Sequence, residues 1–384
     1  MKLSVLITII YVFLCFEISF SQEVPFIELK KHDGPVHVAR FSPDGKFLAT
    51  AGEENVIYLW DTGTWEVVTE FTGKHFRPIH DVVFSPDGKF LYSAGYKVVI
   101  VWDVSGEYLT TLTGGTSDIW SLDMSHDGNL IVAGSYDKKI FVWDVVREEL
   151  VREIEGHDKS VLAVALSPDG KYIASGSLDN TVRLWDFMTG ETIRTHRGHG
   201  GNIYSITFSP DSRYFASASK DNTIKLWSVN AEKSIRTLTG HQQAVMDVEF
   251  SPDGFFLLSS SFDKTVRLWE TTTGNTIYSF VEHGAPVNDV VFFPSGEKVV
   301  TAGEEGTLFV WELAAEIFVD YCCFEEFENT IGGSDLFLPK QKGESRDEYK
   351  ARQEEANRFE QDLVQELYNK YMNRLPDVPF ELEK

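Results

Sequence analysis

The chain has 384 residues, of which 42% are hydrophobic and 13% aromatic, so it can bury a sizeable core. Its formal net charge is −24, and the sequence contains no basic stripe with interleaved aromatic residues. Such a charge would repel a phosphate backbone, so we expect no nucleic-acid partner. The acidic balance favours neutral or basic protein partners.

The first residues have the pattern of an export signal. Lys2 precedes an apolar run over residues 3–16 that is too short to span a bilayer comfortably. Residues 19–21 (Ser-Phe-Ser) then offer small side chains where a signal peptidase requires them. We therefore predict a signal peptide at residues 1–21, cleavage before Gln22, and a secreted or periplasmic protein with no integral membrane span in the mature chain. The alternative is an uncleaved N-terminal anchor that tethers the protein to a membrane.

Seven tryptophans recur along the chain at steps of 41 or 42 residues. A fixed period of about 40–45 residues indicates a repeat architecture, in which each unit buries its apolar faces against its neighbours. The seven positions are Trp60, Trp102, Trp143, Trp185, Trp227, Trp269 and Trp311.

Each period contains the pattern of four short strands, which is clearest over residues 156–196. Alternating apolar residues there precede the sequence Ser-Pro-Asp-Gly at residues 167–170. Proline and glycine favour a tight reversal, so these four residues are predicted to form a turn. Further strands are predicted at residues 172–177, 181–185 and 191–195, where short β-prone runs alternate with turn residues. Together the four strands would form one antiparallel blade.

The repeated dipeptides resemble those of the WD-repeat β-propeller family. The resemblance covers about residues 25–313 and implies an all-β fold, a seven-bladed β-propeller. Residues 26–30 match the fourth strand of a repeat, whereas the last repeat lacks one, so we expect this N-terminal strand to close the ring and remove an open sheet edge. The dipeptides are Gly156-His157, Gly198-His199, Gly240-His241, Trp60-Asp61, Trp102-Asp103, Trp143-Asp144 and Trp185-Asp186.

Histidine, serine, aspartate and tryptophan recur together in repeats four to six. The resemblance implies that they form a buried hydrogen-bond network in each blade, where the indole N–H needs an acceptor. One protein does not need an identical active site in several blades, so we interpret these residues as structural and expect no catalytic residues, no cofactor and no metal. The set is His157, Ser175, Asp179, Trp185, His199, Ser217, Asp221, Trp227, His241, Ser259, Asp263 and Trp269.

Four repeats depart from this pattern. The third has Gly115 and Ala133 where histidine and serine are expected, and the second is one residue short, so that its turn at residues 96–97 lacks the aspartate. The first and seventh carry Glu54 and Glu305 at the aspartate position. We predict that these blades lose part or all of the network, and that blades two and three have the lower local stability.

In the resembled family, partners often bind the face that carries the loops between blades. Three positions per repeat point to that face, and in blades three to six they include aromatic and apolar residues that are typical binding anchors. We predict a partner-binding surface for a protein or peptide there. Its residues are Asp118, Trp120, Tyr136, Leu162, Leu178, Asn202, Tyr204, Lys220, Met246 and Phe262.

The corresponding positions of blades seven, one and two are polar: Glu304, Asn288, Glu53, His37 and His80. We interpret them as a polar rim. The alternative is a hydrolase or metal-binding enzyme that uses His37, His80 and Glu53, since histidine and glutamate are common metal ligands.

The residues after the repeats form a separate element. We expect residues 314–343 to be irregular, because Gly332-Gly333 and Pro339 disfavour a helix, and residues 344–384 to form an amphipathic helix and tail. Ser345 and Glu348 form a capping box at the start of this helix, which should end near Leu375. The helix either docks on the propeller, where it would cover the apolar surface, or binds a partner or a second copy.

The cysteines indicate no metal site. Cys15 lies in the signal segment, and Cys322 and Cys323 are adjacent, so that a bridge between them is expected to be strained. Their spacing does not match a zinc site either.

The repeats, the export signal and the lack of a catalytic pattern together predict an exported, non-catalytic protein-interaction scaffold.

Overall fold

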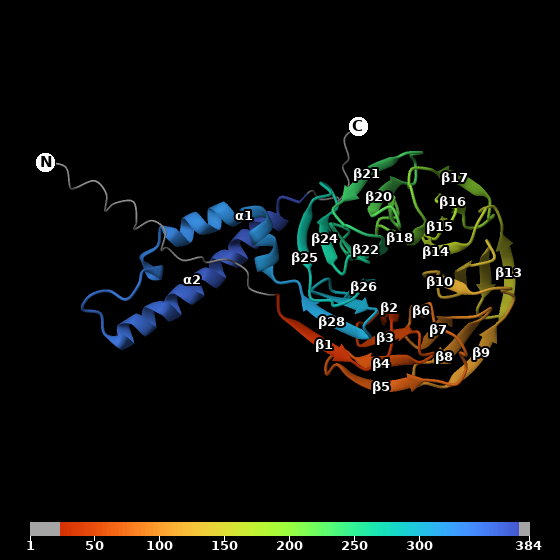
Figure 1. Ribbon diagram of the computed structural model, residues 1–384, viewed down its shortest axis with the longest axis horizontal. Coiled ribbons are helices and arrows are strands. Elements are labelled where there is room, and N and C mark those ends of the chain that lie inside the picture. Colours follow the sequence, from red (N-terminus) through yellow and green to blue (C-terminus); the bar gives the residue numbers. More distant parts are fainter. Residues whose placement is uncertain (1–23, 376–384) are drawn as a thin grey trace.

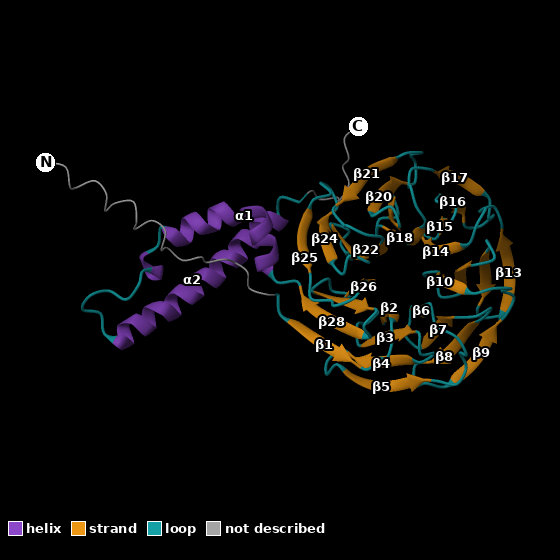
Figure 2. Ribbon diagram, viewed as in Figure 1, coloured by secondary structure: helices purple, strands orange, loops and turns teal. Residues whose placement is uncertain are grey.

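The computed structural model describes residues 24–375 as a ring of seven β-sheets with a helical arm at one side (Figures 1 and 2). Each sheet has four antiparallel strands, which follow one another from the innermost strand at the centre of the ring to the outermost strand at its edge. This confirms the predicted seven-bladed all-β propeller. The predicted signal peptide at residues 1–21 and its cleavage site lie outside the described residues.

The strands follow the repeats in chain order. Blades one to three consist of β2 (Val36–Phe41), β3 (Phe47–Gly52), β4 (Ile57–Asp61) and β5 (Glu66–Phe71); β6 (Asp81–Phe84), β7 (Phe90–Ala94), β8 (Val99–Asp103) and β9 (Tyr108–Leu112); β10 (Ile119–Met124), β11 (Leu130–Ser135), β12 (Ile140–Asp144) and β13 (Glu149–Ile154). Blades four and five consist of β14 (Val161–Leu166), β15 (Tyr172–Ser177), β16 (Val182–Asp186) and β17 (Thr192–His196); β18 (Ile203–Phe208), β19 (Tyr214–Ser219), β20 (Thr223–Ser228) and β21 (Ser234–Thr239). Blades six and seven consist of β22 (Val245–Phe250), β23 (Phe256–Ser261), β24 (Val266–Glu270) and β25 (Thr276–Phe280); β26 (Val287–Phe292), β27 (Lys298–Gly303), β28 (Thr307–Glu312) and the N-terminal β1 (Phe26–Lys30).

The Ser-Pro-Asp-Gly turns fix the register between the first two strands of a blade. In blade four, the Ser167 hydroxyl accepts the backbone N–H of Tyr172 (2.9 Å) and donates to Asp169 (2.7 Å). Gly170 follows at φ +68°, a left-handed conformation that strains residues with a Cβ. The same local hydrogen bonds recur in other blades, so the turn sequence itself sets where each hairpin reverses.

The cores lie between neighbouring blades. One cluster packs Trp185 of blade four against Val132, Ile140 and Ile154 of blade three, and all four side chains are buried. Similar clusters join the other neighbours. No blade therefore buries its apolar face alone, which is why a repeat of this kind needs the ring.

β1 closes the ring. It pairs antiparallel with β28, with Phe26 opposite Trp311 and Lys30 opposite Thr307. Leu29 is buried between blades seven and one, and the Phe26 ring lies 4.9 Å from the indole of Trp311. The predicted closure by residues 26–30 is confirmed.

Removing residues 24–30 should destabilise the whole ring. The truncation exposes the edge of β28 and loses the burial of Leu29, which alone contributes about 1.5–3 kcal/mol. We expect a lower and broader thermal transition, measured by circular dichroism, than for a chain that begins at residue 24. An unchanged midpoint would show that closure by β1 is dispensable.

Two helices and a short 3-10 turn follow the propeller and form an arm that projects from the ring (Figure 2). They are α1 (Ala315–Gly332), η1 (Asp335–Phe337) and α2 (Arg346–Met372). The expectation that residues 314–343 are irregular is wrong, because α1 occupies most of that segment. Its glycine pair ends the helix and does not prevent it, since Phe327 and Ile331 pack on α2.

The second helix follows its sequence more closely. Ser345 caps α2, and Ser345 and Glu348 form the predicted capping box. The helix ends at Met372, slightly before the expected Leu375. Its buried residues Leu363, Val364 and Leu367 face α1, so the two helices form an antiparallel pair with its own small core.

The paired cysteines lie at a kink in α1. Cys323 leaves the helical region (φ −139°, ψ 15°), and the structure joins Cys322 and Cys323 in a disulfide. The sequence had counted against such a bridge, because the two cysteines are adjacent. The non-helical backbone at Cys323 is the local change that accommodates the bridge, and no regular helix would have provided it.

The arm is anchored on blade six through Glu270. The Trp-Asp dipeptide of blades one to four is replaced here by Trp269-Glu270, and the longer carboxylate accepts hydrogen bonds from Tyr371 (2.9 Å) and Tyr321 (3.2 Å). Burial and this carboxylate raise the pKa of Tyr371, which therefore remains a donor. Apolar contacts around Phe318 complete the junction.

Replacing Glu270 by aspartate, the residue of blades one to four, should loosen the arm. The shorter side chain leaves a buried tyrosine hydroxyl without its acceptor, which costs about 1–3 kcal/mol. We expect faster amide hydrogen exchange in α1 and α2, with the inner strands unchanged. The matched control is Glu312→Asp in the equivalent dipeptide of blade seven, whose carboxylate is exposed; equal effects of both changes would contradict the anchor.

Candidate functional site

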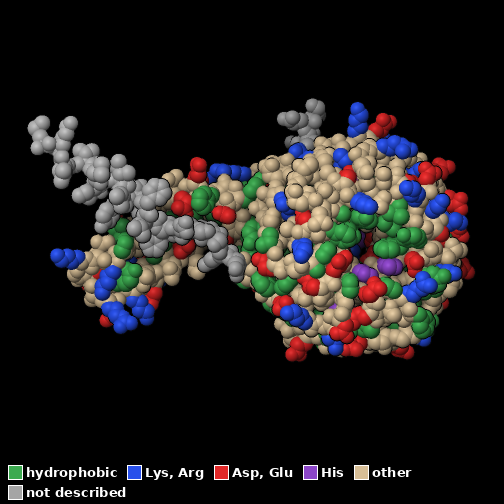
Figure 3. Space-filling model, in the orientation of Figure 1, with side chains coloured by type: hydrophobic (Ala, Val, Ile, Leu, Met, Phe, Trp, Pro, Cys, Tyr) green, Lys and Arg blue, Asp and Glu red, His purple; other side chains and the backbone are tan. Residues whose placement is uncertain are grey.

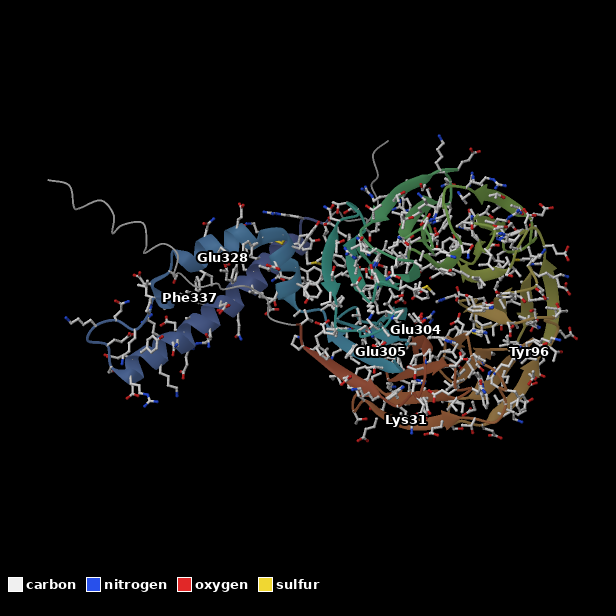
Figure 4. All side chains as sticks on the ribbon, viewed as in Figure 1. Lys31, Tyr96, Glu304, Glu305, Glu328 and Phe337 are labelled. Carbon is white, nitrogen blue, oxygen red and sulfur yellow. A yellow bond between two sulfur atoms is a disulfide. The ribbon has the colours of Figure 1, made fainter. Side chains whose placement is uncertain are left out.

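The first strands of the seven blades surround a central cavity of about 720 Å³. Figure 3 shows hydrophobic and histidine side chains at the border of this hollow, with acidic side chains nearby, and Figure 4 places Glu304 beside it. The cavity opens on the face that carries the loops between blades, which we call the channel mouth.

The structure brings most of the predicted partner-binding residues together at this mouth. Eight of the ten line the cavity: Trp120, Tyr136, Leu162, Leu178, Asn202, Tyr204, Met246 and Phe262. Asp118 and Lys220 lie outside it. Tyr136 is 45% exposed, whereas Leu162 is only 7% exposed, because β14 is enclosed by β10 and β18. Leu162 therefore contributes little exposed area to the predicted partner-binding surface.

Four rings form a row across blades one to three. His37 stacks on His80 at a centroid distance of 5.8 Å, and His80 stacks on Trp120 at 4.1 Å. Trp120 in turn contacts the Tyr136 ring at 5.8 Å. We call these four residues the aromatic row. It joins the apolar surface and the polar rim, which the sequence presented as two separate arcs.

The middle of the row has unsatisfied polar atoms. Trp120 Nε1 and His80 Nδ1 are buried and have no hydrogen-bond partner within the described part of the chain. Burial, and to a smaller extent the neighbouring His37, lowers the pKa of His80 to about 4, so its imidazole is neutral near pH 7. Buried polar atoms without a hydrogen-bond partner are uncommon in folded proteins, so a ligand that reached these two atoms would gain hydrogen bonds here.

The polar rim does not form a converging set of ligands. His37 Nε2 lies 3.6 Å from Glu53, but the His37 and His80 rings present their faces to each other. Asn288 donates to the backbone of Val36 (3.0 Å). Among residues 24–375 no group of three His, Cys, Asp or Glu residues could hold a metal ion.

Below the mouth, inner-strand carboxylates join neighbouring blades. Asp289 accepts both the backbone N–H of Ala39 and the guanidinium of Arg40, each at 2.8 Å. Asp81 accepts the N–H of Leu122 (2.8 Å) in the same way. These contacts connect blade seven to blade one and blade two to blade three.

Two further carboxylates form no ion pair with any cation of residues 24–375. Asp123 accepts the N–H of Leu166 (2.7 Å), and Glu249 accepts that of Phe292 (2.6 Å). Burial raises the pKa of Asp123 to about 6 and that of Glu249 to about 8. Our reading of the sequence missed these residues, although an acidic residue inside an apolar first strand was the available signal.

The repeated polar residues form one hydrogen-bond chain per blade. In blade four, Ser175 Oγ lies 2.8 Å from His157 Nε2 and accepts the Trp185 indole N–H at 2.7 Å. His157 Nδ1 lies 2.9 Å from Asp179. Although burial alone would raise it, hydrogen bonds from His157 and Thr181 lower the pKa of Asp179. Blades five and six repeat these contacts at 2.8–2.9 Å.

Blades one and seven keep the chain with other residues, which corrects the expectation that Glu54 and Glu305 weaken it. In blade one, Thr50 replaces the serine and accepts the indole N–H of Trp60 (2.8 Å), and His32 bridges Thr50 and Glu54. Blade seven does the same with His283, Thr301 and Glu305. The longer glutamate and the threonine hydroxyl supply the same acceptors. Spacing alone could have identified His32 and His283, although no glycine precedes them.

Blades two and three have incomplete chains. In blade two, His75 and Trp102 share the Ser93 hydroxyl, but within the described residues no carboxylate meets His75. Burial lowers the pKa of His75 to about 4. In blade three the Trp143 indole donates to the backbone carbonyl of Thr113 (2.9 Å). Their lower stability stays a prediction.

A repeated four-stranded blade with this polar chain defines a β-propeller built from tryptophan-centred repeats. The model of the "WD domain, G-beta repeat" matches residues 23–61, 65–103 and 274–312. The model of the "Echinoderm microtubule-associated protein second beta-propeller" matches residues 119–282. Together with the seven blades, these matches place the chain in the WD40-repeat β-propeller family.

Relatives share the repeats over short stretches only. A component of chromatin assembly factor 1 from Mus musculus is 25% identical over 129 residues, which are 34% of this chain and 19% of the relative. Protein HIR1 of Candida albicans is 26% identical over 35% of this chain and 12% of its own. Autophagy-related protein 16 of Arabidopsis thaliana is 25% identical over 30% of this chain and 23% of its own. The chain thus spans less than a quarter of each of these relatives.

Replacing Ser217 by alanine should destabilise blade five. The change removes the hydroxyl shared by Trp227 and His199, so two buried groups lose their partner at a cost of about 1–3 kcal/mol each. We expect the midpoint of urea unfolding to fall accordingly. Ser228→Ala, on the partly exposed end of β20, is the control and should have little effect; a loss no larger than that of the control would refute a stabilising network.

Proposed function

We propose that this protein is an exported, non-catalytic scaffold that binds a protein or peptide at the channel mouth of blades three to six. The observation that carries the proposal is the aromatic row beside half-buried Tyr204, Met246 and Phe262 around one cavity. Rigid aromatic side chains next to a hollow are typical binding anchors, since they bury much area at little entropic cost. WD40 propellers generally bind other proteins, and the fold alone implies no chemistry.

The arm leaves this surface accessible. Among the described residues, α1 packs on β25 at the outer edge of blade six, away from the first strands that line the cavity. The alternative explanation of the apolar surface was that the C-terminal helix covers the mouth. The hydrogen bond from Tyr371 of this helix to Glu270 on blade six argues against that explanation.

Export is the second part of the proposal. It rests on the sequence of residues 1–21, with the charged start, the short apolar run and the small residues before Gln22. No helix among residues 24–375 is long and apolar enough to cross a membrane. N-terminal sequencing of the protein from its native host separates a chain that begins at Gln22 from one that retains the segment as an anchor.

A triple substitution should abolish partner binding at the mouth. In the variant Trp120→Ala, Tyr204→Ala, Phe262→Ala, the anchors are removed from three blades, and we expect at least a tenfold loss of bound partner. The tagged protein and the variant are purified from the native envelope fraction, and the partner identified by mass spectrometry is then titrated as a purified protein.

The matched control is Val151→Ala, Met188→Ala, Ile193→Ala, which removes exposed apolar residues far from the mouth. Circular dichroism must show that both variants are folded. Retention of the same partner by the mouth variant and by the control would rule out the channel mouth as the binding site.

A further inference from the structure

A second exposed surface lies on blade two. Phe76 is 87% exposed, more than any other large hydrophobic side chain in residues 24–375. It lies in the loop before β6, next to the exposed Arg77 and close in sequence to Lys74. We call Lys74, Phe76, Arg77, Tyr96 and Lys97 the blade-two patch. The channel mouth does not include these residues.

The cations of this patch are held by aromatic rings and have no carboxylate partners. The Arg77 guanidinium lies 4.1 Å and the Lys97 ammonium 4.8 Å from the centroid of the Tyr96 ring, and Lys74 lies 3.8 Å from that of Tyr108. Within the described chain none of the three forms an ion pair. In a protein with a net charge of −24, three unpaired cations around an exposed phenylalanine form an unusual surface.

The arm carries a surface of the opposite kind. Every charged residue of α1 is acidic, and Phe324 is 43% exposed among them. A hollow beside the kink is lined by Phe324, Glu325 and Glu326 together with the two bridged cysteines. Glu326 is paired with Lys370 of α2, whereas Glu325 forms no ion pair within the described residues. Figure 3 shows hydrophobic side chains flanked by acidic ones over α1. We call this the arm hollow.

We infer that the blade-two patch of one molecule binds the arm hollow of a second copy. Phe76 provides an apolar side chain for the hollow, and Arg77 and Lys97 approach Glu325. The two surfaces are complementary in charge. In Figure 4, Tyr96 lies at one end of the molecule and the arm residues Glu328 and Phe337 at the other, so one copy cannot pair its own surfaces.

Such a contact joins different surfaces of the two copies. A heterologous contact of this kind leaves a free patch at one end and a free hollow at the other, so it extends into a head-to-tail chain unless the rotation closes a ring. Because the paired charges are exposed, high salt should weaken the association by screening them. At low salt the net charge of −24 on each copy opposes the contact, so the association should be strongest at intermediate salt.

Sedimentation velocity of the full mature chain tests this inference. At physiological salt, where the overall repulsion is screened, we expect a concentration-dependent increase of the sedimentation coefficient. Phe76→Ala, Arg77→Glu or Glu325→Arg should each weaken the association at least tenfold. Val146→Ala, another highly exposed apolar residue, is the control and should change nothing. A wild-type protein that stays monomeric over the whole concentration range overturns the inference.

The charge swap decides which surfaces meet. Arg77→Glu and Glu325→Arg proteins should each associate poorly alone, yet associate with one another when mixed, because the mixture pairs arginine with glutamate at every contact. Thermal unfolding establishes that both variants are folded. If mixing restores nothing, or if the variants associate like the wild type, the patch and the hollow are not partners.

Discussion

A buried indole N–H is the constraint on which the ring depends. Each blade places a tryptophan between its sheet and that of the preceding blade, where the side chain fills the core but brings a donor that water cannot reach. Six blades satisfy the donor with a serine or threonine hydroxyl, and blade three uses the carbonyl of Thr113. The hydroxyl is in turn oriented by a histidine that reaches the loop face, so one hydrogen-bond chain couples the core of a blade to the loops that form the channel mouth.

The sequence predicted the structure well where a few neighbouring residues determine it. It predicted less where the structure depends on contacts with residues far away in the sequence. Tryptophan spacing predicted the blades, and Ser345 with Glu348 predicted the start of α2, because turn and cap chemistry is local. We expected Glu54, which replaces the aspartate, to weaken the hydrogen-bond network of blade one. That expectation was wrong because the longer glutamate side chain still reaches His32, and a sequence motif does not show how far a side chain reaches. α1 was missed because its stability comes from packing on α2 and blade six, which no local pattern reveals.

The candidate site shows the same division. The loop-face positions were assigned by the repeat register, and eight of the ten in blades three to six line the cavity. The stacking of His80 on Trp120 was not foreseen, because it joins residues of neighbouring blades whose separation depends on the ring geometry. The same holds for Arg40, whose charge is balanced by Asp289 from the far end of the chain. Contacts between blades are set by closure, and closure is a property of the whole ring.

The position of β1 has a consequence for the order of events during synthesis. Phe26 is made before the other strands of the ring, but its partner Trp311 follows only after nearly the whole ring. Until then the strand has no sheet to join, and blade seven has an open edge, so the last step of folding closes a loop that spans all seven repeats. The propeller is therefore a fold of high contact order, whose blades can assemble early but whose ring is completed late. The intermediate that precedes this last step has nearly all its blades formed and still exposes the open sheet edge of blade seven.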